Sequence, residues 1–196
     1  MFASSPPVSD PLPTCLTSYN GRTDFRRIGG ILPVLYRAFK KLVGVCFNIL
    51  NFLLAGNLPP FACVGVIIED QGRFLVVQLP EGGYAFPGGF MRWREHPTQT
   101  AERECREETG LHIRTHDVIG YYSITSPQLD RMSTLNIIYR GEVISGELHS
   151  SIEGRPCWLP EEGLQGKLTT LHRTILADYH EYRAQEQRRQ MSIKPV

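Results

Sequence analysis

The stretch from residue 89 to residue 111 constrains this chain most, because it places three carboxylates on one side of a single predicted helix. Glu104, Glu107 and Glu108 stand at i, i+3 and i+4, so they share a helix face, where like charges repel one another. Hard divalent cations such as Mg²⁺ and Mn²⁺ take oxygen ligands and bind through carboxylates together with substrate phosphates. The cluster therefore predicts metal-assisted phosphate chemistry.

The limits of this helix are specified as well. Pro97 suits the first helical position, and Gly110 suits the left-handed position just past the end. A solvated helix with surface pairs such as Arg103 with Glu107 would explain neither the glycines nor the unshielded acidic face. The sequence thus specifies a loop, a helix and a stop around the acidic face.

The same stretch resembles the Nudix box, a pattern that reads G, five residues, E, seven residues, R-E-U-x-E-E-x-G-U, where U is a bulky aliphatic residue. The first U position departs from the pattern because it holds Cys105, which packs as a small hydrophobe on the opposite side of the helix. The other specified positions match in register: Gly89, Glu95, Arg103, Glu104, Glu107, Glu108, Gly110 and Leu111. The resemblance implies an α/β fold, the Nudix α/β/α sandwich with a mixed sheet, over roughly residues 60 to 185.

The resemblance also implies roles for these residues, with Mg²⁺ or Mn²⁺ as the cofactor. Arg103 would orient the glutamates, and Glu95 would be an outer ligand or a structural partner. The implied metal ligands are the carbonyl of Gly89 and the carboxylates of Glu104, Glu107 and Glu108.

The general base differs between members of the family, so two candidates stay open. Glu107 is the first, as a further metal ligand or as the base that activates water. Glu153, in the loop before the last predicted strand, is the rival, although a solvated loop acid is the more common reading. With Glu104 and Arg103, these residues form the predicted catalytic set.

The substrate is expected to be a small nucleotide, a nucleoside diphosphate derivative whose pyrophosphate bond is hydrolysed. Arg92 and Pro127 are assigned to substrate binding. Pro127 lies sixteen residues beyond Leu111, a spacing similar to the marker of ADP-ribose pyrophosphatases, although a loop breaker explains it equally well. The sequence thus favours ADP-ribose or an ADP-sugar. The alternative is a catalytically silent Nudix-like ligand-binding or membrane-associated module, but such domains typically lose box glutamates.

Charge and cysteine usage narrow the class of protein. Residues 1–60 carry six Lys and Arg against two Asp, which leaves residues 61–196 acidic. No long basic groove is indicated, so we expect no nucleic-acid partner. The five cysteines are odd in number and contain no C-x-x-C pair, which favours free thiols without a disulfide framework or a zinc site. No apolar signal segment precedes residue 30, so a cytoplasmic location is expected.

Four segments follow one another along the chain. They are a disordered Pro/Ser-rich extension at 1–29, a basic amphipathic helix at 30–58, a Nudix hydrolase domain at 59–187, and a tail at 188–196. Within the domain, we expect a hairpin of strands 62–69 and 73–79, further strands at 117–125, 134–144 and 155–159, and a closing helix at 168–190.

The helix expected at residues 34–55 has a narrow polar stripe and a wide apolar face, and three interpretations stay open. A membrane span is disfavoured, because the uncharged run from Leu42 to Ala55 contains two asparagines and is too short. A helix lying in the membrane interface fits the basic stripe beside the apolar face. Packing on its own domain, or in a homodimer, fits as well.

Overall fold

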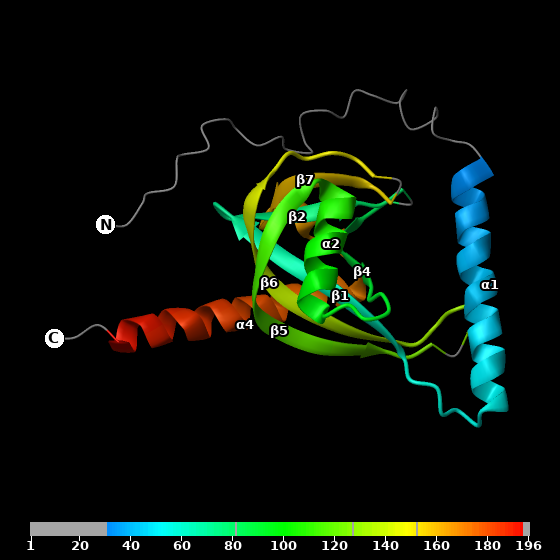
Figure 1. Cartoon of the computed structure of the whole chain (residues 1–196). Coiled ribbons are helices and arrows are strands. Elements are labelled where there is room, and N and C mark those ends of the chain that lie inside the picture. The colour runs from blue at the N-terminus through cyan, green and yellow to red at the C-terminus, as the bar shows by residue number, and fades with distance from the viewer. Residues whose placement is uncertain (1–30, 81, 127, 152, 194–196) are drawn as a thin grey trace.

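The computed structural model describes residues 31–80, 82–126, 128–151 and 153–193 as a curved β-sheet with helices on both sides and one further helix at the periphery (Figure 1). The helices are α1 (Ile31–Leu53), α2 (Pro97–Thr109), α3 (Glu161–Leu164) and α4 (Thr170–Ile193). The strands are β1 (Phe61–Asp70), β2 (Arg73–Gln78), β3 (Tyr84–Ala85), β4 (Gly88–Phe90), β5 (Leu111–Ile124), β6 (Thr134–Gly146) and β7 (Arg155–Pro160).

The sheet is mixed, as expected. Its strand order is β3-β2-β1-β6-β5, with β4 paired to β1 and β7 paired to β2. β1 and β6 run parallel, whereas the other pairs are antiparallel. The β1–β2 hairpin turns through Gln71 and Gly72, both at positive φ, which matches the right-handed twist of the strands that they join.

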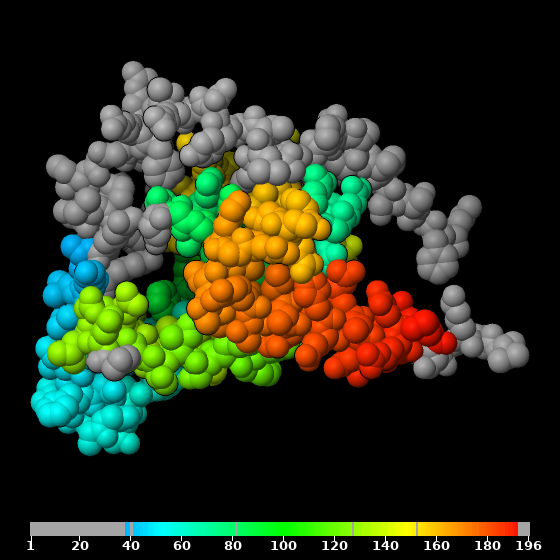
Figure 2. Space-filling model, turned by 180° about the vertical axis from the view of Figure 1, so that it is seen from behind, coloured from blue at the N-terminus to red at the C-terminus, as the bar shows by residue number. Residues whose placement is uncertain are grey.

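Two hydrophobic layers hold the helices on the sheet. Val66 and Ile68 of β1 pack with Leu75 of β2 on the side that α2 covers. The intervening residues, including Ile67 and Phe74, pack on the opposite side with α4. This alternation follows from the period of two in a β-strand, and it confirms the α/β/α sandwich. Figure 2 shows α4, coloured orange to red, spread over its side of the molecule.

The observed limits differ from the expected ones at several places. β5 begins at Leu111 instead of residue 117, because the left-handed Gly110 turns the chain directly into the sheet and Leu111 and Ile113 alternate as buried residues. β3 and β4, of two and three residues, were not expected, since such short runs carry no periodicity. The proposed disorder of residues 1–29, the role of Pro127 and the last three residues of the tail fall outside the described residues.

The cysteines differ from expectation at one position. Cys46, Cys63 and Cys105 are free thiols, but Cys157 in β7 is disulfide-bonded. Sequence spacing could not reveal this, because a disulfide depends on the distance between two Cα atoms in the fold.

Helix α1 runs along the edge of the domain and ends close to its expected stop. Leu53 is its last residue, and Gly56 at φ +80 donates its backbone N–H to the carbonyl of Asn51 at 2.8 Å, which closes the end. Among the described residues, no helix has the length and apolar character needed to cross a membrane.

Candidate functional site

The glycine turn before α2 brings the chain backbone against the acidic face of that helix. Gly88 and Gly89 belong to β4, which pairs with β1 opposite Gly65 and Val64. A Cβ atom added to Gly89 would lie 2.6 Å from Cδ of Glu104 and 2.7 Å from both of its carboxylate oxygens. Only a residue without a side chain permits this approach, so the Glu104 carboxylate lies directly on the β4 backbone.

Glu108 is the most deeply placed of the three box carboxylates on α2. It is buried, and its Oε2 accepts the backbone N–H of Gly88 at 3.0 Å. Burial raises the pKa of Glu108, and the neighbouring charges of Glu153 and Glu104 and a hydrogen bond with Glu153 raise it further. Glu153 therefore reaches this cluster from the loop before β7.

The pKa of Glu104 is raised for the same reasons. Burial is the largest cause, and the negative charges of Glu107 and Glu153 add to it, whereas the bond from Arg103 acts in the opposite direction. Carboxyl groups that share a site disfavour one another's ionisation, and a nearby cation removes that penalty. Glu104, Glu108 and Glu153 thus form a cluster of crowded carboxyl groups beside the glycine turn.

Arg103 organises the other side of the cluster. Its side chain is only 9% exposed, and all five of its N–H donors are used. Nε and Nη2 bond the Glu95 carboxylate at 2.6 and 2.9 Å, and Nη2 also donates to the carbonyl of Phe90. Nη1 donates to Glu104 at 2.6 Å and to Glu107 at 3.1 Å. One guanidinium therefore joins the loop after β4 to two box glutamates.

Glu95 completes this support. The hydrogen bonds from Arg103 lower its pKa to about 2, and further bonds from the Arg92 backbone and the Thr100 hydroxyl contribute in the same direction. The α2 helix begins just after it, where His96 caps the helix and exchanges hydrogen bonds with the first turn. Glu95 is thus a structural partner, one of the two roles expected for it.

Glu107 lies at the exposed rim of the cluster. Its side chain is 43% exposed, and both of its oxygens accept bonds from Nη2 of Arg92, at 3.0 and 3.2 Å. Arg92 is itself exposed, so its guanidinium is accessible to a phosphate group from solution. Arg103 links Glu107 to Glu104, and Arg92 binds Glu107 from the exposed side.

The donor set fits a hard divalent cation that retains some of its water. Mg²⁺ is typically bound through one or two carboxylates together with waters and substrate phosphates, and not by a cage made of protein alone. The Glu104 and Glu108 carboxylates, which lie against the glycine turn, are the residues that would supply such a pair of oxygen ligands. Within the described part of the chain, no group of three or more His, Cys, Asp or Glu side chains is placed to hold a metal ion.

The structure brings together most residues that the sequence singled out. Glu104 lies against Gly89, and Glu108 lies beside Glu104 and Glu153, whereas Arg92, Arg103 and Glu107 form the adjoining ion-pair group. Sequence reasoning missed the Gly88 N–H and the Thr100 hydroxyl, both of which bind carboxylates of the site. The pair of glycines before the box was the available signal for the first, and nothing in the sequence pointed to the second.

Comparison with known proteins identifies relatives of this chain. The family model for the NUDIX domain matches residues 59–179. An ADP-ribose pyrophosphatase of Methanocaldococcus jannaschii is 32% identical over 127 residues, which cover 62% of this chain and 74% of that protein. A MutT-like protein of Streptomyces ambofaciens is 25% identical over 125 residues, covering 61% and 78%.

A solved structure gives the same result for the fold. A NUDIX hydrolase from Nitrosomonas europaea superposes with a TM-score of 0.57 at 25% identity, covering 63% of this chain and 90% of that one. Divalent metals are general cofactors of this family, in agreement with the acidic cluster. The chain therefore belongs to the NUDIX family, and it is a pyrophosphohydrolase of that family.

Proposed function

We propose that the domain hydrolyses a pyrophosphate bond in a nucleoside diphosphate derivative, with Mg²⁺ or Mn²⁺ bound by Glu104, Glu108 and the Gly89 carbonyl. The observation that carries this proposal is the convergence of the buried Glu108, the half-buried Glu104 and Glu153 beside the glycine turn. A bound cation would offset the repulsion between these carboxylates and would also bind the phosphates of an anionic substrate.

The metal ion, Arg103 and Arg92 have different roles in the proposed reaction. A bound divalent cation neutralises phosphate oxygens and lowers the pKa of water. Arg103 fixes the orientation of Glu104 and of the loop after β4 through its five hydrogen bonds. Arg92, on the exposed rim, binds a substrate phosphate by exchanging its contact with Glu107.

Two glutamates remain as candidates for the base that takes a proton from water. Glu107 is accessible but bonded to two arginines. Glu153 lies among the metal-binding carboxylates, and the loop that carries it joins the site from another part of the chain. The position of Glu153 gives it more support than its sequence context did, and we place both residues in the catalytic set.

The substrate class rests on resemblance. One relative, from Methanocaldococcus jannaschii, is an ADP-ribose pyrophosphatase, which supports ADP-ribose or an ADP-sugar as the substrate of this chain. Pro127 is assigned to substrate binding on sequence spacing alone. We further propose a cytoplasmic location, and the segment limits at residues 59 and 187 stay predictions.

The proposal is tested by a screen of nucleoside diphosphate derivatives with Mg²⁺ or Mn²⁺, in which phosphate products are measured. Chelator should abolish hydrolysis, and the better substrates should be ADP-ribose or ADP-sugars. Glu107→Gln and Glu153→Gln each preserve volume while removing charge, and the variant that removes the base should lower kcat by about 10² or more.

Glu102→Gln is the matched control, because Glu102 lies on the same helix but bonds Thr115, away from the cluster. It should leave kcat nearly unchanged. Full activity in excess chelator would contradict the metal mechanism. Metal-dependent ligand binding without turnover of any compound would instead support the silent ligand-binding module.

A further inference from the structure

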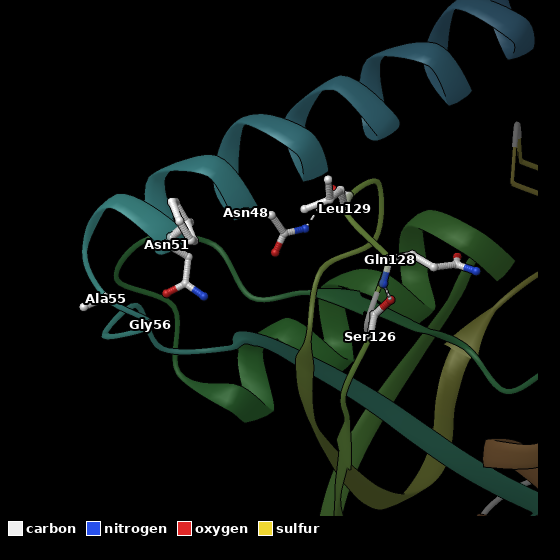
Figure 3. Close-up of a pocket in the computed structure, with 8 residues that line it drawn as sticks. Asn48, Asn51, Ala55, Gly56, Ser126, Gln128 and Leu129 are labelled. Atoms are coloured by element: carbon white, nitrogen blue, oxygen red, sulfur yellow. Dashed lines mark hydrogen bonds between the residues drawn. The ribbon is translucent and has the colours of Figure 1, made fainter.

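Helix α1 contacts its own domain through its polar side. Nδ2 of Asn48 donates to the backbone carbonyls of Leu129 at 2.8 Å and Arg131 at 3.0 Å, in the loop between β5 and β6 (Figure 3). Gly44 lies so close to this loop that an added Cβ would be 2.7 Å from the carbonyl oxygen of Asp130. The inner side of the helix is therefore defined by polar and close backbone contacts.

Two further contacts fix the same orientation. Lys41 pairs with Asp130 at 3.7 Å, and the ring of Phe47 packs on Phe61 of β1 with 4.5 Å between centroids. When α1 is projected at 100° per residue, Lys41, Gly44, Phe47 and Asn48 all fall within about 120° of arc. These contacts all lie on one side of α1.

The opposite side of α1 is apolar and exposed. Leu53 is 72% exposed, and Phe39 is 62% exposed. The residues Phe39, Leu42, Ile49, Leu50, Leu53 and Leu54, all exposed, fall within about 140° of arc on the outer side, and we call this set the outer face. In Figures 1 and 2, α1 lies at the edge of the molecule. The usual arrangement, apolar side inward, is inverted.

We propose that the outer face binds the surface of an anionic lipid bilayer, with α1 lying between the membrane and the domain. An apolar helix face opposite a basic polar side is typical of helices that lie in the membrane interface. Arg37, Lys40 and Lys41 lie within five residues of one another on the polar side of the N-terminal half of the helix. Residues 1–60 carry six Lys and Arg against two Asp. This positive charge complements anionic headgroups.

A second copy of the chain fits the outer face less well. The exposed residues from 39 to 54 form a strip roughly 22 Å long and about 10 Å wide, which presents only a few hundred Å². Stable protein interfaces bury about 800 Å² on each partner. The strip is too narrow for such an interface alone, whereas a bilayer needs only an apolar strip and nearby positive charge.

The test is co-sedimentation of the full chain with vesicles of phosphatidylcholine mixed with phosphatidylglycerol, compared with vesicles of phosphatidylcholine alone. The double variant Ile49→Gln/Leu53→Gln removes two outer-face side chains and keeps residues with good helix propensity. Ile144→Gln/Met191→Gln is the matched control, because both side chains are similarly exposed but lie in β6 and α4.

The wild type should bind the anionic vesicles, and added salt should weaken the binding. The outer-face variant should lower the partition coefficient at least about tenfold, and the control variant should change it less than about twofold. All three proteins should hydrolyse a water-soluble substrate at the same rate. A wild type that ignores anionic vesicles would overturn the proposal, as would a variant that binds them normally.

Sedimentation velocity without lipid tests whether the outer face instead binds a second copy of the chain. If the wild type is a dimer that the outer-face variant converts to a monomer, then the outer face is an interface between copies and the membrane proposal is wrong. A monomeric wild type with lipid-dependent binding supports the proposal. Neither result depends on hydrolysis, so the proposed function is tested separately.

Discussion

Replacing Arg103 with Met tests whether one buried guanidinium organises the site. Methionine keeps much of the apolar stem but removes all five donors. The Glu95 carboxylate would lose the bonds at 2.6 and 2.9 Å, and Glu104 would lose its bond at 2.6 Å. Both carboxylates are largely excluded from solvent, so water cannot fully replace these contacts.

The magnitude follows from the loss of a buried partner. Removing one member of a buried ion pair costs about 3–5 kcal/mol, so Arg103→Met should lower the free energy of unfolding by that amount. Glu95→Gln keeps the shape of the side chain but removes its charge, and it should cost about 1–3 kcal/mol. Since each change removes the same bidentate contact, the double variant should be less destabilised than the sum by about 1–3 kcal/mol.

The assay is urea unfolding followed by circular dichroism, with the slope compared between variants to check that the transition stays two-state. Arg189→Met is the control, because its pair with Glu186 is exposed on α4, and it should change stability by no more than about 0.5 kcal/mol. Two results would refute the reasoning: a cost under about 1 kcal/mol for Arg103→Met, or additive effects of the two changes within about 0.5 kcal/mol.

Three further predictions follow from single contacts. Gly89→Ala places a Cβ 2.6 Å from Cδ of Glu104, so the carboxylate must move, and kcat should fall about tenfold or more in steady-state assays while the fold persists in circular dichroism. Burial lowers the pKa of His172 from 6.5 to about 4, so between these pH values the unfolded chain binds more protons than the folded chain. The free energy of unfolding should therefore fall as the pH decreases from 6.5 to about 4. The His172→Gln variant should lose this pH dependence in denaturant titrations. Asn48→Ala removes two bonds to the β5–β6 loop, so amide hydrogen exchange in α1 should accelerate while exchange in α2 stays the same.

The parts of this fold that follow from local rules were predictable from the sequence. Proline at the start and left-handed glycine at the end fix α2 to the residue, since both act within one helical turn. The β1–β2 hairpin is likewise set by its turn residues and by alternating burial. The resemblance of residues 89–111 to the Nudix box then predicted which carboxylates form the site, because residues at i, i+3 and i+4 share one face of a helix in any fold.

Features that depend on distant segments were not predictable in the same way. Glu153 joins the cluster only because β7 pairs with β2, which brings the loop before β7 to the glycine turn. The orientation of α1 depends on carbonyl groups of the β5–β6 loop, which bind Asn48 and turn the apolar side outward. A helical projection separates the two sides of α1 but cannot say which one meets the domain.

The distribution of charge explains why the site needs both its arginines and a cation. Arg103 binds Glu95, Glu104 and Glu107 together, and Arg92 binds Glu107 again, so positive charge is concentrated at the rim and on the supporting side. Glu108 accepts the Gly88 N–H, shares a hydrogen bond with Glu153 and lies beside Glu104. The carboxyl groups of the interior therefore disfavour one another's ionisation until a cation balances their charge, and a pyrophosphate binds beside them only with that cation between. Substrate affinity should thus depend on the divalent ion as strongly as the rate does. Equilibrium binding of ADP-ribose, measured with and without Mg²⁺, tests this dependence. The Glu153→Gln variant is used for the measurement, because loss of the base would keep turnover from consuming the ligand.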